Sequence, residues 1–562
     1  MNEALSTVAD DYWEWYLAEH PSEALFYGDH RYVDQVEDLS RQAEDAAIEQ
    51  LEAFADRAAA IDPASLDVDE RITRSVLIHE AGTSAGELRS RMLELAVDPF
   101  NGLHVALLQY VGQIPLATGE HAESLITKWI KTNGMFQQAV QRLKQGVARE
   151  RTPYRSAVEK VIAQIDGYLA SPIDSDPFVT VRPPSQFTEE ETAVWRSDLA
   201  DAVSRHVRPG YQAYRDALVG DVIDKARPDE RCGISWLADG EEVYARAIRR
   251  HTTLDRAPFD IHSTGLEIIG DLGDEYRSLT SSVLGLADVD VIYERLRTDP
   301  ELRFSSGEEI VAAAQQAMDR ASGAVGEWFG RLPVTECVMA EIPAQGAEEA
   351  PLGYYSPPAD DGSRPGMYFV NTSEPHTRTR FESEALAFHE SVPGHHFQIA
   401  IAQELEDVHP FRTHSYVTPY VEGWGLYTER LADEMGLYTS DLTRMGMLSF
   451  DSWRAGRLVV DTGIHALGWS RQEAIDYLTA NSPQAVINIE AEVDRYIGWP
   501  GQALAYMTGR LEINRIRAAA EKRLGGDFDI KGFHDVVLGS GPVPLPVLDE
   551  LVSSWVGGVA GA

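Results

Sequence analysis

The sequence predicts a mainly α-helical protein with one small β element. Three observations support this fold class: apolar residues recur at helical spacing over long segments, Pro and Gly clusters separate those segments, and strand signals are sparse. Residues 307–331 and 510–524, for example, each place an apolar stripe along one helix face. The best strand signal is MYFVN at 367–371, because Tyr, Phe and Val favour a pleated surface. We therefore expect a short strand or hairpin just before residue 372.

The first clear helix along the chain covers residues 48–61. Its apolar positions, which include Ile48, Leu51 and Phe54, recur every three or four residues with acidic residues and Gln between them. Pro and Gly clusters interrupt the later helical segments, and each indicates a loop or turn. These clusters lie at residues 171–177, 182–185, 356–366 and 539–546.

The length of 562 residues suits several domains or one large two-lobed unit. A connecting segment is expected near residues 285–300, around the stretch ADVDVIYERLRTDPEL. We therefore expect an N-terminal helical lobe at residues 1–290 and a C-terminal helical lobe at residues 291–562, or else one continuous unit.

The composition excludes several classes of function. Asp and Glu number 90 against 49 Lys and Arg, so the net charge is −41. Such a chain is not expected to bind nucleic-acid phosphates or anionic membranes, because both need clustered basic residues. No stretch approaches the ~18 apolar residues of a membrane span, and the N-terminus lacks the pattern of a secretory signal. Two cysteines, Cys232 and Cys337, cannot form a disulfide framework. We expect a soluble, cytoplasmic protein.

The most informative segment is EALAFHESVPGHHFQIA at 384–400. Zinc hydrolases often carry His-Glu-x-x-His on a helix, where two His four residues apart bind the metal and the Glu is the general base. His389 and Glu390 match the start of that pattern. The position four residues after His389 is Pro393, however, which cannot bind a metal.

The Pro-Gly pair decides which later histidine can complete the site. His395 lies six residues after His389, and in a straight helix it would point about 240° away. Pro393 and Gly394 disfavour a regular helix, so one widened turn can place His395 where the second ligand normally lies. His396 could instead reach from two turns away. We favour His395, because one widened turn keeps the two rings close.

A third ligand is expected on a later helix. Glu422, in YVEGWGLYTER at 420–430, lies 27 residues after His395 and begins an apolar helical stretch. Two imidazoles and a carboxylate leave the fourth tetrahedral position of one Zn²⁺ open, as catalysis requires. Glu429, seven residues later on the same face, could orient a histidine ring.

The segment HESVPGHHFQ resembles the HExxPGH signature of a bacterial family known as domain of unknown function 885. Further matches to that family are SRPGMYFVNT at 363–372, YVEGWGLYTERLADEMG at 420–436, WRAGRLVVDTGIHALGW at 453–469, RYIGWPGQALAYMTGRLEI at 495–513 and FHDVVLGSGPVPLPVL at 533–548. In the HExxPGH signature the matched second histidine is His395. The N-terminal half matches more loosely.

The family is similar in fold to mainly helical zinc peptidases: the thermostable (Taq) carboxypeptidases, the neurolysin-like oligopeptidases and angiotensin-converting enzyme. The resemblance implies a zincin-like, two-lobed helical body around a deep channel with the metal on its floor. It also implies Tyr or His donors late in the chain that stabilise a developing oxyanion. Tyr506 is the first candidate, followed by Tyr496 and His465.

A substrate α-carboxylate would suit a bidentate arginine, and Arg454, Arg457 and Arg510 all lie in the matched segments. Nothing in the sequence chooses among them. The strand MYFVN could lie beside the channel and pair with an extended peptide as an edge strand.

These observations predict a zinc-dependent hydrolase, of the peptidase type, that acts on short peptides or small amides. Glu390 would take a proton from the attacking water and pass it to the leaving amine. Two alternatives stay open: a metallohydrolase of a non-peptide amide or ester, and a metal-free helical binding or scaffold protein. The sequence predicts neither an oligomeric state nor the position of the cleaved bond.

Overall fold

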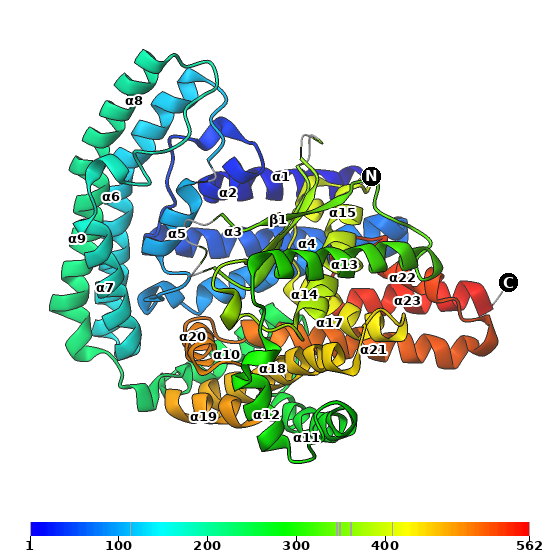
Figure 1. The fold of residues 1–562 in the computed structure, drawn as a ribbon. Helices are drawn as coiled ribbons and strands as arrows, with labels where there is room; N and C mark the ends of the chain where they lie inside the picture. The colour runs from blue at the N-terminus through cyan, green and yellow to red at the C-terminus, as the bar shows by residue number, and fades with distance from the viewer. Residues whose placement is uncertain are drawn as a thin grey trace. The chain divides into compact units, whose positions relative to one another are not determined.

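The structure is a computed structural model, and Figure 1 shows its ribbon. It describes residues 2–112, 114–343, 347, 350–359, 362, 364–406 and 408–560. Helices dominate these residues, which also contain one small sheet, so the mainly α prediction is confirmed. In the part of the chain described, no helix is both long enough and apolar enough to cross a membrane.

The chain divides into two compact units. Unit 1 contains residues 1–62, 80–243 and 468–472, and unit 2 contains residues 63–79, 244–467 and 473–562. The boundary predicted between residues 290 and 291 falls inside α12 (Val289–Thr298), within unit 2.

Unit 1 is helical in all its long elements. Its helices are α1 (Glu3–Glu19), α2 (Pro21–Phe26), α3 (Arg41–Ala59), α5 (Leu103–Val111), α6 (Gly119–Ala148), α7 (Arg155–Ala170), α8 (Glu189–Ala202) and α9 (Arg208–Ala217), with parts of α4 (Val68–Arg89) and α10 (Gly240–Thr252). The predicted helix at 48–61 lies in α3 except for its last two residues. In Figure 1, α6 runs alongside α9, and their contact carries the apolar core of the unit. Trp129 is fully buried in that core, and its indole N–H donates to the Phe178 carbonyl at 3.2 Å.

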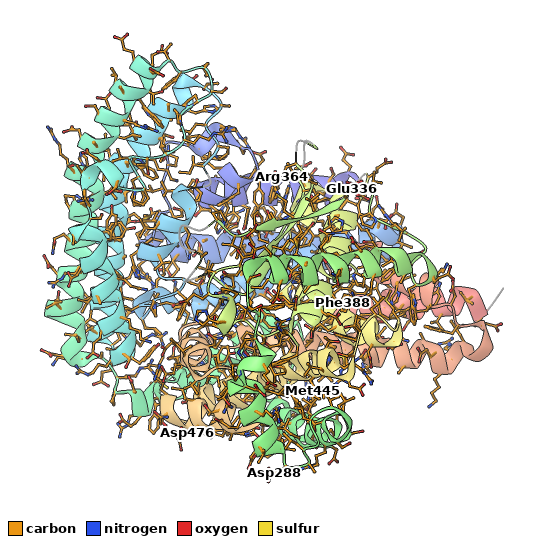
Figure 2. All side chains as sticks on the ribbon, in the orientation of Figure 1. Asp288, Glu336, Arg364, Phe388, Met445 and Asp476 are labelled. Carbon is orange, nitrogen blue, oxygen red and sulfur yellow. The ribbon has the colours of Figure 1, made fainter. Side chains whose placement is uncertain are left out.

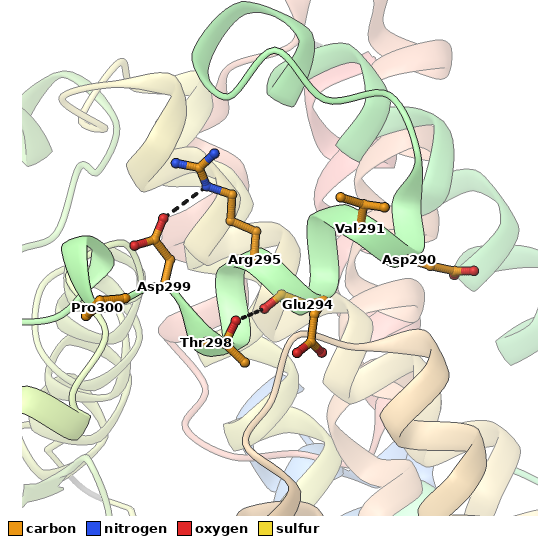
Figure 3. Close-up of a pocket in the computed structure, with 7 residues that line it drawn as sticks. All are labelled: Asp290, Val291, Glu294, Arg295, Thr298, Asp299 and Pro300. Carbon is orange, nitrogen blue, oxygen red and sulfur yellow. Dashed lines mark hydrogen bonds and ion pairs between the residues drawn. The ribbon is translucent and has the colours of Figure 1, made fainter.

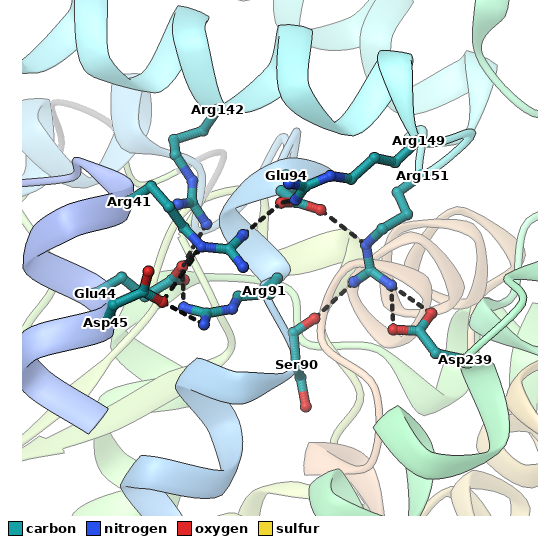
Figure 4. A network of polar contacts seen from close by, with 10 residues as sticks. All are labelled: Arg41, Glu44, Asp45, Ser90, Arg91, Glu94, Arg142, Arg149, Arg151 and Asp239. Carbon is teal, nitrogen blue, oxygen red and sulfur yellow. Dashed lines mark hydrogen bonds and ion pairs between the residues drawn. The ribbon is translucent and has the colours of Figure 1, made fainter. Parts of the chain in front are cut away.

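Buried charges in unit 1 are compensated by arginines. Glu44 accepts from Arg91 at 2.6 Å and from Arg142 at 2.5 Å, and all three side chains are largely shielded from solvent. Glu94, only 1% exposed, lies 3.1 Å from Arg151. Figure 4 shows these ion pairs as one network. Since every charge in it is satisfied by another, the network is a structural feature and not a candidate binding site.

Unit 2 contains the remaining helices and the sheet. Its helices are α11 (Pro258–Val283), α12, α13 (Gly307–Ala324), α14 (Ser383–Glu390), α15 (His395–Gln403), α16 (Pro410–Thr413), α17 (Thr418–Glu434), α18 (Asp441–His465), α19 (Arg471–Asn481), α20 (Val486–Gly498), α21 (Ala505–Leu524), α22 (Ile530–Leu538) and α23 (Leu545–Ala560). Residues 307–331 and 510–524, predicted as helices, lie largely in α13 and α21. Phe388 and Met445 are fully buried in this unit, whereas Asp288 and Asp476 are exposed (Figure 2).

The sheet of unit 2 has three short strands. They are β1 (Cys337–Glu341), β2 (Gly353–Ser356) and β3 (Gly366–Val370), in the order β1-β3-β2. β3 runs parallel to β1 and antiparallel to β2. A strand at the predicted place is therefore confirmed. The hypothesis that it is an edge strand is wrong, because both its sides are already hydrogen-bonded, so β3 cannot take up an added peptide strand.

Candidate metal centre

The chain breaks its helix after Glu390 and starts a new one at His395. The bond between Val392 and Pro393 is cis. The His396 N–H donates to the Ser391 carbonyl at 3.2 Å, a span of five residues in place of the four of an α-helix. A side chain at Gly394 would collide with the carbonyl oxygens of Phe388 and His389, in the last turn of α14, so this turn requires glycine.

The widened turn brings two imidazoles together. The ring centroids of His389 and His395 lie 4.7 Å apart, with their planes at 89°. His396 points elsewhere: its Nδ1 accepts from the Tyr355 hydroxyl at 2.9 Å, and its Nε2 donates to the Thr335 carbonyl at 3.0 Å. The two candidates for the second ligand were His395 and His396, and the geometry favours His395 as the partner of His389.

Glu422, in the first turns of α17, completes the cluster. Its Oε2 lies 3.7 Å from the Nε2 of His389 and 3.6 Å from the Nε2 of His395. The three side chains are 9% exposed or less, and their ligand atoms lie within 4.8 Å of one another. These separations are too long for hydrogen bonds. A tetrahedral zinc with bonds of about 2.0–2.1 Å needs its ligand atoms about 3.3–3.5 Å apart, so the donor set fits one such ion.

Electrostatics also favour a cation here. Burial by itself would lower the pKa of His389, but the carboxylates of Glu422 and Glu429 outweigh it and raise the pKa to about 9. Burial likewise opposes the charge on Glu422, yet the neighbouring imidazoles hold the pKa of Glu422 well below its usual range. The buried carboxylates therefore require positive charge, which protonated imidazoles or a bound cation can supply.

Several contacts hold α17 against the turn. The indole N–H of Trp424 donates to the Pro393 carbonyl at 3.0 Å, and the Thr428 hydroxyl contacts the Phe388 carbonyl at 3.2 Å. Gly425 leaves room for the ring of His389, because a Cβ there would lie 2.8 Å from the ring's Nε2. The position of Glu422 beside the two histidines follows from this close packing.

Glu390, the predicted general base, is the last residue of α14. Its side chain is partly exposed and makes no hydrogen bond among the described residues. Burial raises the pKa of Glu390, and the positive charges of His389, His395 and Arg454 oppose that rise. A carboxylate with a raised pKa and an open face has the properties of a proton acceptor.

Two tyrosines lie near Glu422. The Tyr416 hydroxyl, in the loop before α17, donates to the Oε1 of Glu422 at 2.9 Å. Tyr506, in the first turn of α21, has its pKa raised by burial and by the charge of Glu422. Tyr506 was predicted, whereas sequence reasoning missed Tyr416. The one signal for Tyr416 was its position six residues before Glu422, and loops carry no periodicity that would have marked it.

The lower-ranked donor candidates are engaged elsewhere. The Nε2 of His465 lies 2.9 Å from the Tyr496 carbonyl, and the ring is buried. The Tyr496 hydroxyl accepts from Trp453 at 3.0 Å and from Arg457 at 2.9 Å. Both side chains therefore hold helices together in the structure.

The three predicted arginines differ in how they are satisfied. Arg510 forms an ion pair with Asp451. Arg457 is paired with Glu492 at 3.0 Å. Arg454 has no ion pair among the described residues, and its Nε and Nη1 are buried without a hydrogen-bond partner.

The pocket of Figure 3 lies on α12 and does not include these residues. Its polar groups pair with one another: the Nε of Arg295 with Asp299 at 3.0 Å, and the Thr298 hydroxyl with the Glu294 carbonyl at 2.7 Å. We assign it no role in the candidate site.

The fold and the cluster define a mainly helical protein with a buried His–His–Glu centre. The chain belongs to a family described as "Bacterial protein of unknown function (DUF885)", whose model matches residues 21–552. This match confirms the family membership that the sequence motifs predicted.

Solved structures with a similar fold include the following two. The structure of the "putative lipoprotein from Colwellia psychrerythraea" shares 25% identity, with a TM-score of 0.92 and coverage of 99% of each chain. A "putative lipoprotein of unknown function from Shewanella oneidensis" shares 17% identity, with a TM-score of 0.77, over 98% of this chain and 99% of that one. A search of curated proteins found no match. The cytoplasmic location predicted for this chain stays a prediction.

Proposed function

We propose that this protein is a metal-dependent hydrolase of the peptidase type, with Zn²⁺ as its metal. The observation that carries the proposal is the convergence of His389, His395 and Glu422 at distances that suit one tetrahedral ion. Those three residues would hold the ion. A divalent cation there would polarise a substrate carbonyl and increase the acidity of water.

Glu390 is the proton carrier in this proposal. It takes one proton from the attacking water, whose oxygen bonds to the carbonyl carbon of the substrate. The C–N bond then breaks, and Glu390 returns the proton to the leaving nitrogen. The partly exposed carboxylate and its raised pKa support this role.

The two tyrosines take different roles. Tyr506 would donate its hydroxyl proton in a hydrogen bond to the carbonyl oxygen as negative charge develops. Tyr416 already donates to Glu422, so it positions that carboxylate and does not contact substrate. A neutral tyrosine can donate such a bond, and the raised pKa of Tyr506 keeps its proton in place.

The resemblance to the helical zinc peptidases extends the proposal to the zincin-like fold, a deep channel and short peptide substrates. The alternatives predict different results in one set of assays. Cleavage of esters or non-peptide amides alone would favour a metallohydrolase that does not act on peptides. The absence of both bound metal and activity would favour a helical binding or scaffold protein.

The test combines metal analysis with cleavage. Protein purified without chelator is analysed for transition metals, and its activity is measured on N-blocked and C-blocked peptide libraries. We expect close to one equivalent of metal, peptide cleavage, and a rate reduced by at least ~10³-fold in Glu390→Gln. A metal content below about a tenth of an equivalent, or an unaltered rate in Glu390→Gln, would contradict the proposal.

A further inference from the structure

Arg454 on α18 is a buried cation of unit 2 without an ion pair among the described residues. The side chain is 6% exposed, and its guanidinium carbon lies 4.5 Å from the Trp453 ring centroid and 4.6 Å from that of Phe450. Its Nε and Nη1 are buried without a hydrogen-bond partner. A buried cation that lacks a counter-charge is costly, and such a group in a folded protein commonly awaits a ligand.

The neighbouring arginines each have an acidic partner, whereas Arg454 has none among the described residues. Arg495 pairs with Glu492 at 3.0 Å and donates to Gln502 at 2.6 Å. Arg457 pairs with the same Glu492. Glu492 therefore pairs with two arginines, and no acidic side chain in the part of the chain that the structure describes pairs with Arg454. In a chain with a net charge of −41 this local excess of positive charge needs an explanation.

Arg454 lies in the electrostatic neighbourhood of the proposed catalytic residues. Burial raises the pKa of Glu390 and of Tyr506, and the positive charge of Arg454 opposes both shifts. One helical turn further along α18, the guanidinium carbon of Arg457 lies 4.4 Å from the Tyr506 ring centroid. The two arginines share a helix face, so both present charge toward the first turn of α21.

We propose that Arg454 binds the C-terminal carboxylate of the substrate, so that the site releases residues from peptides with a free C-terminus. A planar guanidinium can bind a carboxylate through two parallel hydrogen bonds, from Nη2 together with either Nε or Nη1, and among the described residues the structure shows no hydrogen bond from any of these three nitrogens of Arg454. Arg457 adds positive charge but keeps its own partners. This inference rests on the proposed hydrolase function and names the substrate class of the same site.

The experiment uses one tripeptide library in two forms, with free C-termini and with C-terminal amides. Hydrolysis of both is measured by mass spectrometry for the wild type, Arg454→Gln, Arg454→Lys and Arg444→Gln. Arg444 lies on the same helix, with a side chain 37% exposed and paired to Asp433, and serves as the matched control. Circular dichroism verifies that each variant is folded, and Arg454→Lys keeps the charge if the Gln variant does not fold.

We expect the wild type to prefer free C-termini by roughly 30- to 100-fold in kcat/KM. Arg454→Gln should lose that preference through slower cleavage of the free acids alone, Arg454→Lys should retain part of it, and Arg444→Gln should behave as the wild type. Equal cleavage of acids and amides by the wild type would overturn the proposal. Equal slowing of both forms in the Arg454 variants would overturn it as well.

A binding measurement separates this proposal from the hydrolase function. Both libraries are dialysed to equilibrium against the Glu390→Gln protein and against the same protein with Arg454→Gln added. If the wild type cleaves nothing but free acids are retained only when Arg454 is present, the hydrolase function fails and the carboxylate site stands. If free acids and amides are retained equally, the carboxylate site fails, whatever the activity.

Discussion

The Nδ1 of His389 lies 2.8 Å from the Oε1 of Glu429, a carboxylate with no exposed surface. The imidazole therefore donates its Nδ1 proton to Glu429, which leaves the Nε2 lone pair directed at His395 and Glu422. The same bond joins the end of α14 to the middle of α17. Glu429 thus orients the first ligand of the candidate metal centre.

Replacement of that carboxylate should weaken metal binding without removing the fold. Glu429→Gln keeps an oxygen that accepts from Nδ1 but loses the charge that makes Nε2 a stronger ligand. We expect zinc affinity to fall by about 10- to 100-fold, measured by competition with a chromophoric chelator. Glu434→Gln, at the exposed end of the same helix, should leave the affinity unchanged. Equal affinities for Glu429→Gln and the wild type would show that this contact does not tune the ligand.

A single methyl group at Gly425 should disturb the site. The added Cβ would lie 2.7 Å from Cε1 and 2.8 Å from Nε2 of His389, so the ring or α17 must move. We expect Gly425→Ala to lose at least ~90% of bound zinc and to be destabilised by about 1–3 kcal/mol. The readouts are metal analysis and urea unfolding.

Gly323→Ala in α13 is the matched control, because a Cβ there meets nothing within 4 Å. It should keep full metal content, and its stability should match or slightly exceed that of the wild type, since Ala favours the helix. Full zinc content in Gly425→Ala would contradict the packing described for His389.

Asp461 on α18 makes the stability of unit 2 depend on pH. Burial raises the pKa of Asp461 to about 7, although it accepts hydrogen bonds from Tyr244 at 2.5 Å and from the Gly501 N–H at 3.1 Å. Because the folded pKa exceeds the unfolded one, its contribution to stability is present at low pH and is lost as pH rises toward 7.

The variant Asp461→Asn cannot titrate at this position and isolates the effect. The free energy of unfolding of the wild type, relative to that of Asp461→Asn, should fall by roughly 2 kcal/mol between pH 5 and pH 7 and stay level above pH 8. Urea unfolding of metal-free protein at each pH measures this difference. A difference that is constant across the range would mean that Asp461 is already charged at pH 5.

The local features of the site could be predicted because they depend on nearby residues. Pro393 and Gly394 excluded a regular helix whatever surrounds them, so a widened turn between His389 and His395 followed from the sequence. The helical segments followed from apolar periodicity in the same way. Glu422 was found through its spacing and through the family resemblance.

Features set by tertiary packing could not be predicted. The lack of a partner at Arg454, and the pairing of Arg457 with Glu492, depend on how α18 and α20 meet. The central position of β3 depends on two strands that carry weak signals. The inclusion of residues 63–79 in unit 2 depends on contacts far along the chain, which no local pattern reports.

Zinc stoichiometry of three proteins tests the central claim most directly. The wild type, His395→Gln and His396→Gln are loaded with zinc, passed through a desalting column and analysed by mass spectrometry for bound metal. The structure predicts about one equivalent in the wild type and in His396→Gln, and below about a tenth in His395→Gln. Less than a tenth in the wild type, or equal binding by His395→Gln, would contradict a metal centre built on His389, His395 and Glu422.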